Sequence, residues 1–260
     1  MPRILVIVPV AVSDEGLARR ARQSAHVGGD GSLRLHYRPV KINGELFDSF
    51  HDYLIADLAV FEAGMRADAE GFDAVCVDTI SDSGVNALRS VLDIPVVGPG
   101  RAAFLTALML GDRFSVLTQW QGWAELYGRR TQEMGLRHKL VSVRALDVQP
   151  DLSALLDDKE DVVFPRLLEA GRLCIDDGAD VICLGSTTMH RAAEYLAGRL
   201  DVPVVSPGPA SYEFARSLLT LGLSQSRTAY PRAAVPKLEI FERMLSGDPT
   251  GDGEHGPAVA

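Results

Sequence analysis

Gly71-Phe-Asp-Ala-Val-Cys76 returns 107 residues later as Gly178-Ala-Asp-Val-Ile-Cys183. Asp93-Ile-Pro-Val-Val-Gly-Pro-Gly100 returns in the same order, 108 residues later, as Asp201-Val-Pro-Val-Val-Ser-Pro-Gly208. One such match could arise by chance, whereas two in the same order at nearly the same offset indicate an internal duplication. The sequence therefore predicts two copies of one structural unit.

Outward from these stretches, short apolar runs alternate with longer amphipathic segments. The expected strands are residues 4–8, 74–78, 95–98, 114–118, 140–143, 181–185 and 203–206. The expected helices are residues 53–70, 84–91, 102–109, 122–134, 163–177, 190–200 and 212–221. Several strand segments are apolar on both sides of the two-residue period, which is typical of parallel strands covered by helices on both faces. The alternation predicts an α/β fold with mostly parallel sheets.

The composition is that of an ordinary folded protein. Of the 260 residues, 47% are hydrophobic and 23% are charged, which excludes collagen-like, coiled-coil and wholly disordered chains. A net charge of −9 without a Lys/Arg cluster argues against a nucleic-acid or membrane-surface partner. The longest apolar run, residues 4–12, is far shorter than the roughly 20 residues of a membrane-spanning helix, so we expect a cytoplasmic protein. Residues 246–260 have too little apolar content to pack, and we expect a disordered tail.

Two loops at equivalent positions of the duplicated unit are rich in hydroxyl groups. They are Asp78-Thr-Ile-Ser-Asp-Ser-Gly84 and Gly185-Ser-Thr-Thr-Met-His190, and the offset places Thr79 opposite Ser186. Ligands of open parallel sheets bind beyond the carboxyl ends of the strands, where helix N-termini attract negative charge. We therefore expect Thr79 and Ser186 to face each other across a cleft that binds a small anion or a polarised carbonyl. The alternative is that the polar side chains of these loops only cap helices, as Ser81, Asp82, Ser186 and Thr187 could do.

The same segments carry a family resemblance. Gly71-Phe-Asp-Ala-Val, Asp82-Ser-Gly84 and Leu92-Asp-Ile-Pro-Val-Val-Gly98 resemble the first signature of the aspartate/glutamate/hydantoin racemase superfamily. Gly178-Ala-Asp-Val-Ile-Cys-Leu-Gly185, Met189 and Asp201-Val-Pro-Val-Val205 resemble the second. The resemblance extends from about residue 3 to residue 225 and is nearest to the hydantoin and allantoin racemase branch.

This resemblance implies two pseudosymmetric flavodoxin-like lobes that enclose one site. Residues 1–98 with 209–235 would form lobe 1, and residues 99–208 would form lobe 2. In the family, each lobe supplies one cysteine, and the pair acts as base and acid on opposite faces of a carbon α to a carbonyl, without a cofactor. Dimerisation is common in the family, so we expect a homo-oligomer.

The sequence departs from the family at the reacting groups. The two family cysteines fall on Thr79 and Ser186, and an aliphatic hydroxyl is several pKa units more basic than a thiol. Cys76 and Cys183 lie three residues earlier, inside the strands, where an odd separation points their side chains to the opposite face. With Cys174, which lies in a helical segment, they form neither a metal-binding pair nor a disulfide framework. We interpret Cys76 and Cys183 as buried hydrophobic residues.

The expected site residues follow from the loops and strand ends. We assign catalytic roles to Thr79, Ser186 and His190, which lies about one helical turn after Ser186 and titrates near neutral pH. We assign substrate binding to Asp78, Ser81, Asp82, Thr118, Gln119, Tyr127, Thr187 and Thr188. No glycine-rich phosphate loop follows a strand, so no nucleotide cofactor is expected. Asp78, Asp82, His190 and His51 could together bind a metal ion, but their spacing matches no strong metal motif, so no metal is assigned.

Three functions remain open at this stage. The first is a cofactor-independent isomerase or racemase acting on a small carboxylate, hydantoin or ureide in a hydroxyl-lined site. The second is a hydrolase or decarboxylase on the same scaffold, in which Thr79 and Ser186 bind an oxyanion or position water. The third is a protein that binds a small anion without catalysis.

Overall fold

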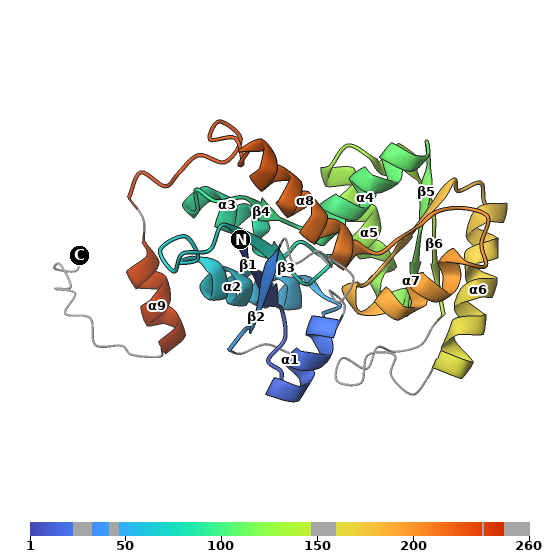
Figure 1. Ribbon diagram of the computed structural model, residues 1–260, viewed down its shortest axis with the longest axis horizontal. Helices are drawn as coiled ribbons and strands as arrows, with labels where there is room; N and C mark the ends of the chain where they lie inside the picture. The colour runs from blue at the N-terminus through green and yellow to red at the C-terminus, as the bar shows by residue number, and fades with distance from the viewer. Residues whose placement is uncertain (23–32, 42–46, 147–159, 236, 247–260) are drawn as a thin grey trace, which may run out of the picture.

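Two four-stranded parallel sheets form the framework of the molecule (Figure 1). The structure is a computed structural model that describes residues 1–22, 33–41, 47–146, 160–235 and 237–246. The first sheet has the order β2-β1-β3-β4, formed by Arg34–Pro39, Arg3–Val8, Ala74–Val77 and Val96–Val97. The second has the order β6-β5-β7-β8, formed by Leu140–Ala145, Phe114–Thr118, Val181–Leu184 and Val204–Val205. The predicted α/β class with parallel sheets is confirmed.

The two sheets repeat one another strand by strand. In the first, β1 pairs with β3 so that Ile4 lies opposite Ala74. In the second, β5 pairs with β7 so that Phe114 lies opposite Val181. The carboxyl ends of β3 and β7, where the duplicated loops begin, therefore occupy equivalent positions in the two lobes.

Helices cover the sheets and link the strands. The α-helices are α1 Asp14–Ala21, α2 Phe50–Gly64, α3 Val85–Val91, α4 Pro99–Leu110, α5 Ala124–Glu133, α6 Glu160–Asp176, α7 His190–Ala197, α8 Pro207–Leu221 and α9 Leu238–Ser246. Three 3₁₀ turns are also described: η2 Gln121–Trp123, η3 Arg137–Lys139 and η4 Thr187–Met189. α9 contacts α2 through Phe61, which meets Phe241 edge to face, and Glu242 of α9 forms an ion pair with Arg66, two residues beyond the end of α2.

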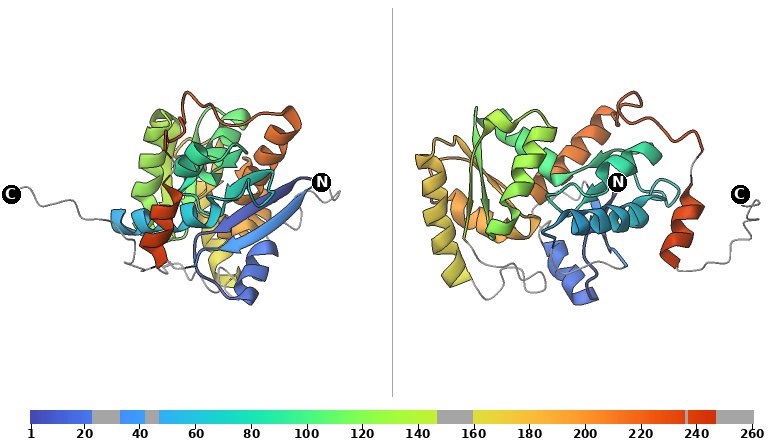
Figure 2. Two further views of the ribbon diagram at one scale, coloured as in Figure 1. Left: turned by 90° about the vertical axis from the view of Figure 1, so that its left-hand side faces the viewer. Right: turned by 180° about the vertical axis from the view of Figure 1, so that it is seen from behind.

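Two of these helices are exchanged between the lobes. α4 follows β4 of the first sheet but packs on β7 and β5 of the second. α8 follows β8 of the second sheet but packs on β3 and β4 of the first. α4 and α8 also pack against each other, and Figure 1 and the right-hand view of Figure 2 show them side by side between the sheets. Each sheet is therefore covered on one face by a helix that follows the other sheet.

The strands leading to the duplicated loops are apolar on both faces. In β3, Val75 and Val77 pack in a cluster with residues of α2 and α3, whereas Cys76 packs with Tyr212 and Ala215 of α8. β7 repeats this arrangement, since its alternate residues pack toward α6 and α7 on one face and toward α4 on the other. Burial on both faces explains why the sequence shows continuous apolar runs in these strands.

The remaining elements differ from the sequence prediction. β2 was not expected, because Arg34–Pro39 is a half-buried edge strand whose charged residues interrupt any apolar run. α1 and α9 were not expected either, and α2 begins at Phe50, where Ser49 and Asp52 form a capping box, and ends at Gly64. β4 and β8 each contain only two residues. The expected disordered tail lies outside the described residues from position 247 onward.

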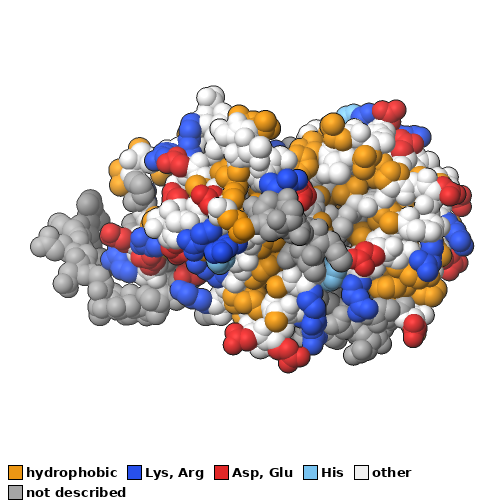
Figure 3. All heavy atoms as spheres, in the orientation of Figure 1, with side chains coloured by type: hydrophobic (Ala, Val, Ile, Leu, Met, Phe, Trp, Pro, Cys, Tyr) orange, Lys and Arg blue, Asp and Glu red, His pale blue; other side chains and the backbone are white. Residues whose placement is uncertain are grey.

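The surface carries no dominant charge of one sign on the face shown in Figure 3. Acidic and basic side chains lie side by side over this face, with hydrophobic side chains between them. Within the described residues, none of the helices combines the length and apolar content needed to cross a lipid bilayer.

Candidate active site

A pocket lies at the carboxyl ends of β3 and β7, and both duplicated loops line it. It encloses about 490 Å³ of empty space, part of which is open solvent. Its lining comprises Pro9, Val10, Arg20, Phe47, Tyr53, Asp78, Thr79, Ile80, Ser81, Trp123, Leu126, Gly185, Ser186, Thr187 and Thr188. Thr79 and Ser186, which the duplication makes equivalent, thus border one space.

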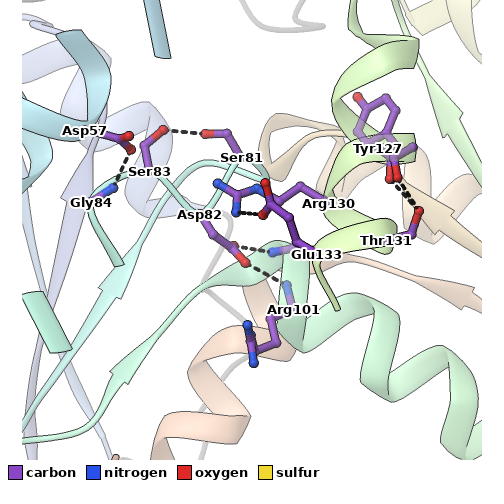
Figure 4. Close-up of polar contacts among 12 residues, drawn as sticks. Asp57, Ser81, Asp82, Ser83, Gly84, Arg101, Tyr127, Arg130, Thr131 and Glu133 are labelled. Atoms are coloured by element: carbon purple, nitrogen blue, oxygen red, sulfur yellow. Dashed lines mark hydrogen bonds and ion pairs between the residues drawn. The ribbon is translucent and has the colours of Figure 1, made fainter. Parts of the chain in front are cut away.

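Hydroxyl groups of the first loop form a chain that leads away from the pocket. Thr79 Oγ1 lies 2.9 Å from Ser81 Oγ, which in turn lies 2.8 Å from the buried Ser83 Oγ. The loop ends at Gly84, whose φ of +72° favours glycine and whose N–H donates to Asp57 Oδ1 at 2.8 Å (Figure 4). Within the part of the chain that the structure describes, the Thr79 hydroxyl is therefore hydrogen-bonded to another hydroxyl and not to a carboxylate or an imidazole.

The second loop repeats this chemistry with a shorter chain. Ser186 Oγ lies 2.9 Å from Thr188 Oγ1 and accepts the N–H of Thr188 at 3.2 Å. Ser186 is the N-cap of η4, so the capping interpretation of this residue is correct. Ser186 is nevertheless half-buried and lines the pocket, so it can cap the turn and also contact a ligand.

Buried hydroxyls fix the peptide groups that precede Thr79 and Ser186. The carbonyl of Asp78 accepts the Thr187 hydroxyl at 3.1 Å, which joins the two lobes. The carbonyl of Gly185 accepts the Tyr127 hydroxyl at 2.7 Å, and Tyr127 also pairs with Thr118 Oγ1 at 2.8 Å. Burial raises the pKa of the Tyr127 phenol well above its ordinary value, so this group remains a neutral donor. Thr118 and Tyr127 thus support the second loop from behind.

Asp82 binds the start of α4. Its carboxylate accepts the backbone N–H of Gly100 at 2.7 Å and that of Arg101 at 3.0 Å (Figure 4). Burial raises the pKa of Asp82, while the nearby Arg130 guanidinium and the two N–H groups act in the opposite direction. Its φ of +52° is left-handed, a region that Asp tolerates better than most residues. The Asp82 side chain therefore ties the first loop to the segment where the chain crosses between lobes.

An apolar wall closes one part of the pocket. Phe47, Tyr53, Trp123 and Leu126 form it, with residues from both sides of the interlobe space. Trp123 Nε1 donates to the Phe47 carbonyl at 2.7 Å, and Tyr53 Oη donates to the same oxygen at 3.4 Å. The Arg129 guanidinium lies 5.1 Å from the Tyr53 ring centroid, a cation–π distance. These contacts hold α2 and α5 together beside the loops.

A buried ion pair lies at another part of the lining. Arg20 Nη1 of α1 lies 3.1 Å from Asp78 Oδ2, and the side chains of Arg20 and Asp78 are 4% and 0% exposed. Asp78 is thus in the pocket as expected, whereas Arg20 is an unexpected member of the lining.

Comparison with known proteins decides the family. A sequence profile described as Asp/Glu/hydantoin racemase matches residues 15–215. The chain belongs to this family. A hydantoin racemase from Rhizobium meliloti is 31% identical over 185 residues, which cover 68% of this chain and 76% of that protein. Another from Paenarthrobacter aurescens is 28% identical over 86% of this chain and 94% of its own length. Allantoin racemase from Pseudomonas fluorescens is similar in structure, with a TM-score of 0.81, 29% identity and coverage of 90% of this chain and 98% of that one.

In this racemase-family chain, some expected site residues line the pocket and others lie behind it. Those in the lining are Asp78, Thr79, Ser81, Ser186, Thr187 and Thr188. Those outside it are Asp82, Thr118, Gln119, Tyr127 and His190. His190 is the first residue of α7, beyond the 3₁₀ turn that follows Ser186. Among the described residues, no group of three or more His, Cys, Asp and Glu side chains is arranged to hold a metal ion.

The cysteines of this family member are buried away from the pocket. Cys76 Sγ donates to the carbonyl of Ser211 in α8, and Cys183 Sγ donates to the carbonyl of Ala103 in α4, both at 3.7 Å. Burial raises the pKa of Cys76 to about 12 and that of Cys174 to about 11, and it raises the pKa of Cys183 further. All three are free thiols that remain protonated at neutral pH, which suits packing and does not suit proton abstraction.

Proposed function

We propose that this protein is an isomerase that inverts a stereocentre α to a carbonyl in a small hydantoin or ureide. The observation that carries the proposal is that Thr79 and Ser186, equivalent residues of the duplicated loops, border one pocket. The similarity to hydantoin and allantoin racemases over most of the chain supports the substrate class. In this proposal the reacting carbon lies between the two loops.

The chemistry of the loops suits stabilisation of an enolate. Removal of the α-proton places negative charge on the adjacent carbonyl oxygen, and hydrogen-bond donors aimed at that oxygen lower the barrier. Thr79 and Ser186 supply hydroxyls for this purpose, beside the backbone N–H groups of their loops. An unassisted hydroxyl is too basic to be the ionised base itself, and both hydroxyls pair with other hydroxyls. We therefore propose that they donate hydrogen bonds to the enolate oxygen. His190, which lies behind the lining one turn beyond Ser186, accepts the α-proton through water, and solvent water returns a proton to the opposite face of the planar carbon.

The test is hydrogen exchange at the stereocentre. Enantiopure 5-benzylhydantoin and allantoin are incubated with the protein in D₂O, with loss of optical activity followed by circular dichroism and deuterium incorporation followed by NMR. Thr79→Ala, Ser186→Ala and His190→Gln should each reduce turnover by roughly 100-fold. Thr220→Ala, which removes an exposed hydroxyl of α8, should leave turnover unchanged.

Each contrary result has a distinct meaning. Exchange no faster than the background without protein, on all ureides tested, would refute the isomerase proposal. Release of carbon dioxide from an arylmalonate, without exchange on hydantoins, would favour a decarboxylase. Full activity of the Thr79→Ala and Ser186→Ala variants would refute the hydroxyl-lined site.

A further inference from the structure

Arg20 is a buried cation with a place in the pocket wall. Its side chain is 4% exposed, and it is the one Lys or Arg among the residues that line the pocket in the described part of the chain. Burying a guanidinium costs hydration energy that the fold must offset. An apolar side chain at this position of α1 would pack without that cost, so stability alone does not account for an arginine here.

Asp78 holds the guanidinium in one orientation. Within the described residues the contact to Asp78 Oδ2 is the hydrogen bond that Arg20 forms, and it uses Nη1 alone. Nε and Nη2 of Arg20 form no hydrogen bond within the described residues, and the residue lines the pocket. The guanidinium is therefore fixed on one side by Asp78 and presents its remaining N–H groups to a ligand.

A carboxylate is the ligand group that best matches this arrangement. The planar guanidinium offers parallel N–H groups whose spacing fits the two oxygens of a carboxylate, and arginine remains charged when buried. The Asp78 carboxylate offsets part of the attraction for a second anion, but it fixes the orientation of the guanidinium, so the carboxylate preference depends on the directed N–H groups of Arg20. The rest of the lining is hydroxyl-rich or apolar, so Arg20 is the strongest feature for distinguishing an anionic from a neutral ligand.

We propose that Arg20 binds a carboxylate on the substrate and that Asp78 positions it, so that the preferred substrate is a hydantoin or ureide with a carboxylate on its side chain. This inference rests on the proposed function for the ureide part and on the geometry of Arg20 for the carboxylate. The substrate then places its reacting carbon at the two loops and its anionic group at α1.

The test compares two ligands of the same shape. 5-Carboxymethylhydantoin carries the carboxylate, and 5-(carbamoylmethyl)hydantoin replaces it by a neutral amide. Binding of each is measured by titration calorimetry, and C5 exchange is measured in D₂O. The unmodified protein should bind the carboxylate ligand at least 10-fold more tightly, and Arg20→Met should abolish this preference while binding the amide within about threefold of the unmodified protein.

Two further variants keep the result interpretable. Arg20→Met leaves the Asp78 carboxylate buried without its counter-ion, which can unfold the protein, so Arg20→Met with Asp78→Asn supplies a neutral pair. Arg19→Met removes the adjacent cation, which pairs with Glu15, and should retain the carboxylate preference.

The outcomes separate this inference from the proposed function. Equal binding of the two ligands by the unmodified protein, or a preference that persists in the folded Arg20 variants, would overturn it. A folded Arg20 variant that loses both ligands equally would also overturn it, because it would show a structural role only. A carboxylate preference that depends on Arg20, without C5 exchange on either ligand or on 5-benzylhydantoin and allantoin, would retain the anion-binding role and refute the isomerase.

Discussion

Thr79 and Ser186 carry hydroxyl groups at the positions where the family resemblance implies thiols. Replacing both residues by cysteine tests the effect of this difference on the reaction. Thr79→Cys with Ser186→Cys should raise the rate of C5 exchange on hydantoins, because a thiol with a pKa of about 8.5 forms a thiolate near neutral pH and a hydroxyl does not. The rate should increase with pH between about 7 and 9 as the thiolates form. A folded double variant without any gain in exchange would mean that this pocket does not place its substrate between the two loops.

The native thiols should affect stability and leave catalysis unchanged. Cys76 has a pKa raised from 9.0 to about 12, so between these values the folded protein holds a proton that the unfolded chain loses. The stabilisation from this proton is complete below pH 9 and is lost as pH rises toward 12. Cys76→Ala should therefore cost about 1 kcal/mol at pH 7 through lost packing, and this deficit should shrink above pH 9.

Urea unfolding at pH 7 and pH 10.5 measures this deficit, and the exchange assay measures turnover. A deficit that is the same at both pH values would show that Cys76 titrates normally. A folded variant with Cys76 and Cys183 both replaced by Ala that is inactive, beside active Thr79→Ala and Ser186→Ala variants, would instead assign the reaction to displaced thiols.

Some residues of the pocket could be predicted from the sequence, and others could not. Thr79, Ser186 and their neighbours follow buried strands at duplicated positions, so their place at one pocket could be predicted from the repeat. Arg20 could not, because it lies on a short helix whose other residues are exposed or half-buried, and nothing in its spacing marks it as buried. Tyr53 and Trp123 enter the pocket through packing between lobes, which no local pattern encodes.

At the scale of elements, the start of α4 and the first loop fit together too closely to admit a side chain. A Cβ on Gly100 would lie 2.4 Å from the carbonyl oxygen of Ile80, which is backbone and cannot move aside easily. Gly100→Ala should therefore destabilise the protein by about 1–3 kcal/mol and displace the loop that carries Thr79. Gly198→Ala is the matched control, since nothing lies within 4 Å of a Cβ at Gly198.

Thermal unfolding and the exchange assay together check this prediction. Gly100→Ala should lose stability and turnover, whereas Gly198→Ala should lose neither to a measurable extent. Equal melting temperatures for the two variants would contradict the close approach of Asp82 and Ile80 to the start of α4.

The strands that are buried on both faces could be predicted from the sequence, whereas the edge strand β2 could not. β1, β3, β5 and β7 are apolar runs whose burial leaves few alternatives, so their positions follow from sequence to within one residue. β2 has a partner on one side only, where backbone hydrogen bonds to β1 hold it and its side chains remain half-exposed. Its strand conformation depends on tertiary pairing, which the alternation of its own residues does not reveal.

At the scale of the whole molecule, α4 and α8 couple the stability of the two lobes, because each helix packs on the sheet of the opposite lobe. The face of β3 that carries Cys76 is covered by Tyr212 and Ala215 of α8, and the corresponding face of β7 is covered by α4. Separation of the halves would expose both apolar faces to water, at a cost proportional to the area uncovered. Each proposed lobe thus has the topology of an independent domain, but its stability depends on a helix that follows the sheet of the other lobe.

This dependence predicts one cooperative unfolding transition for the chain. Differential scanning calorimetry should give a single endotherm whose calorimetric and van't Hoff enthalpies agree, because neither lobe keeps its core once the other has unfolded. A fragment of residues 1–98, which contains the first sheet without α8, should remain unfolded by circular dichroism for the same reason. Two separate endotherms, or a folded fragment, would show that each sheet is stable with the helices of its own half and that the exchanged helices contribute little.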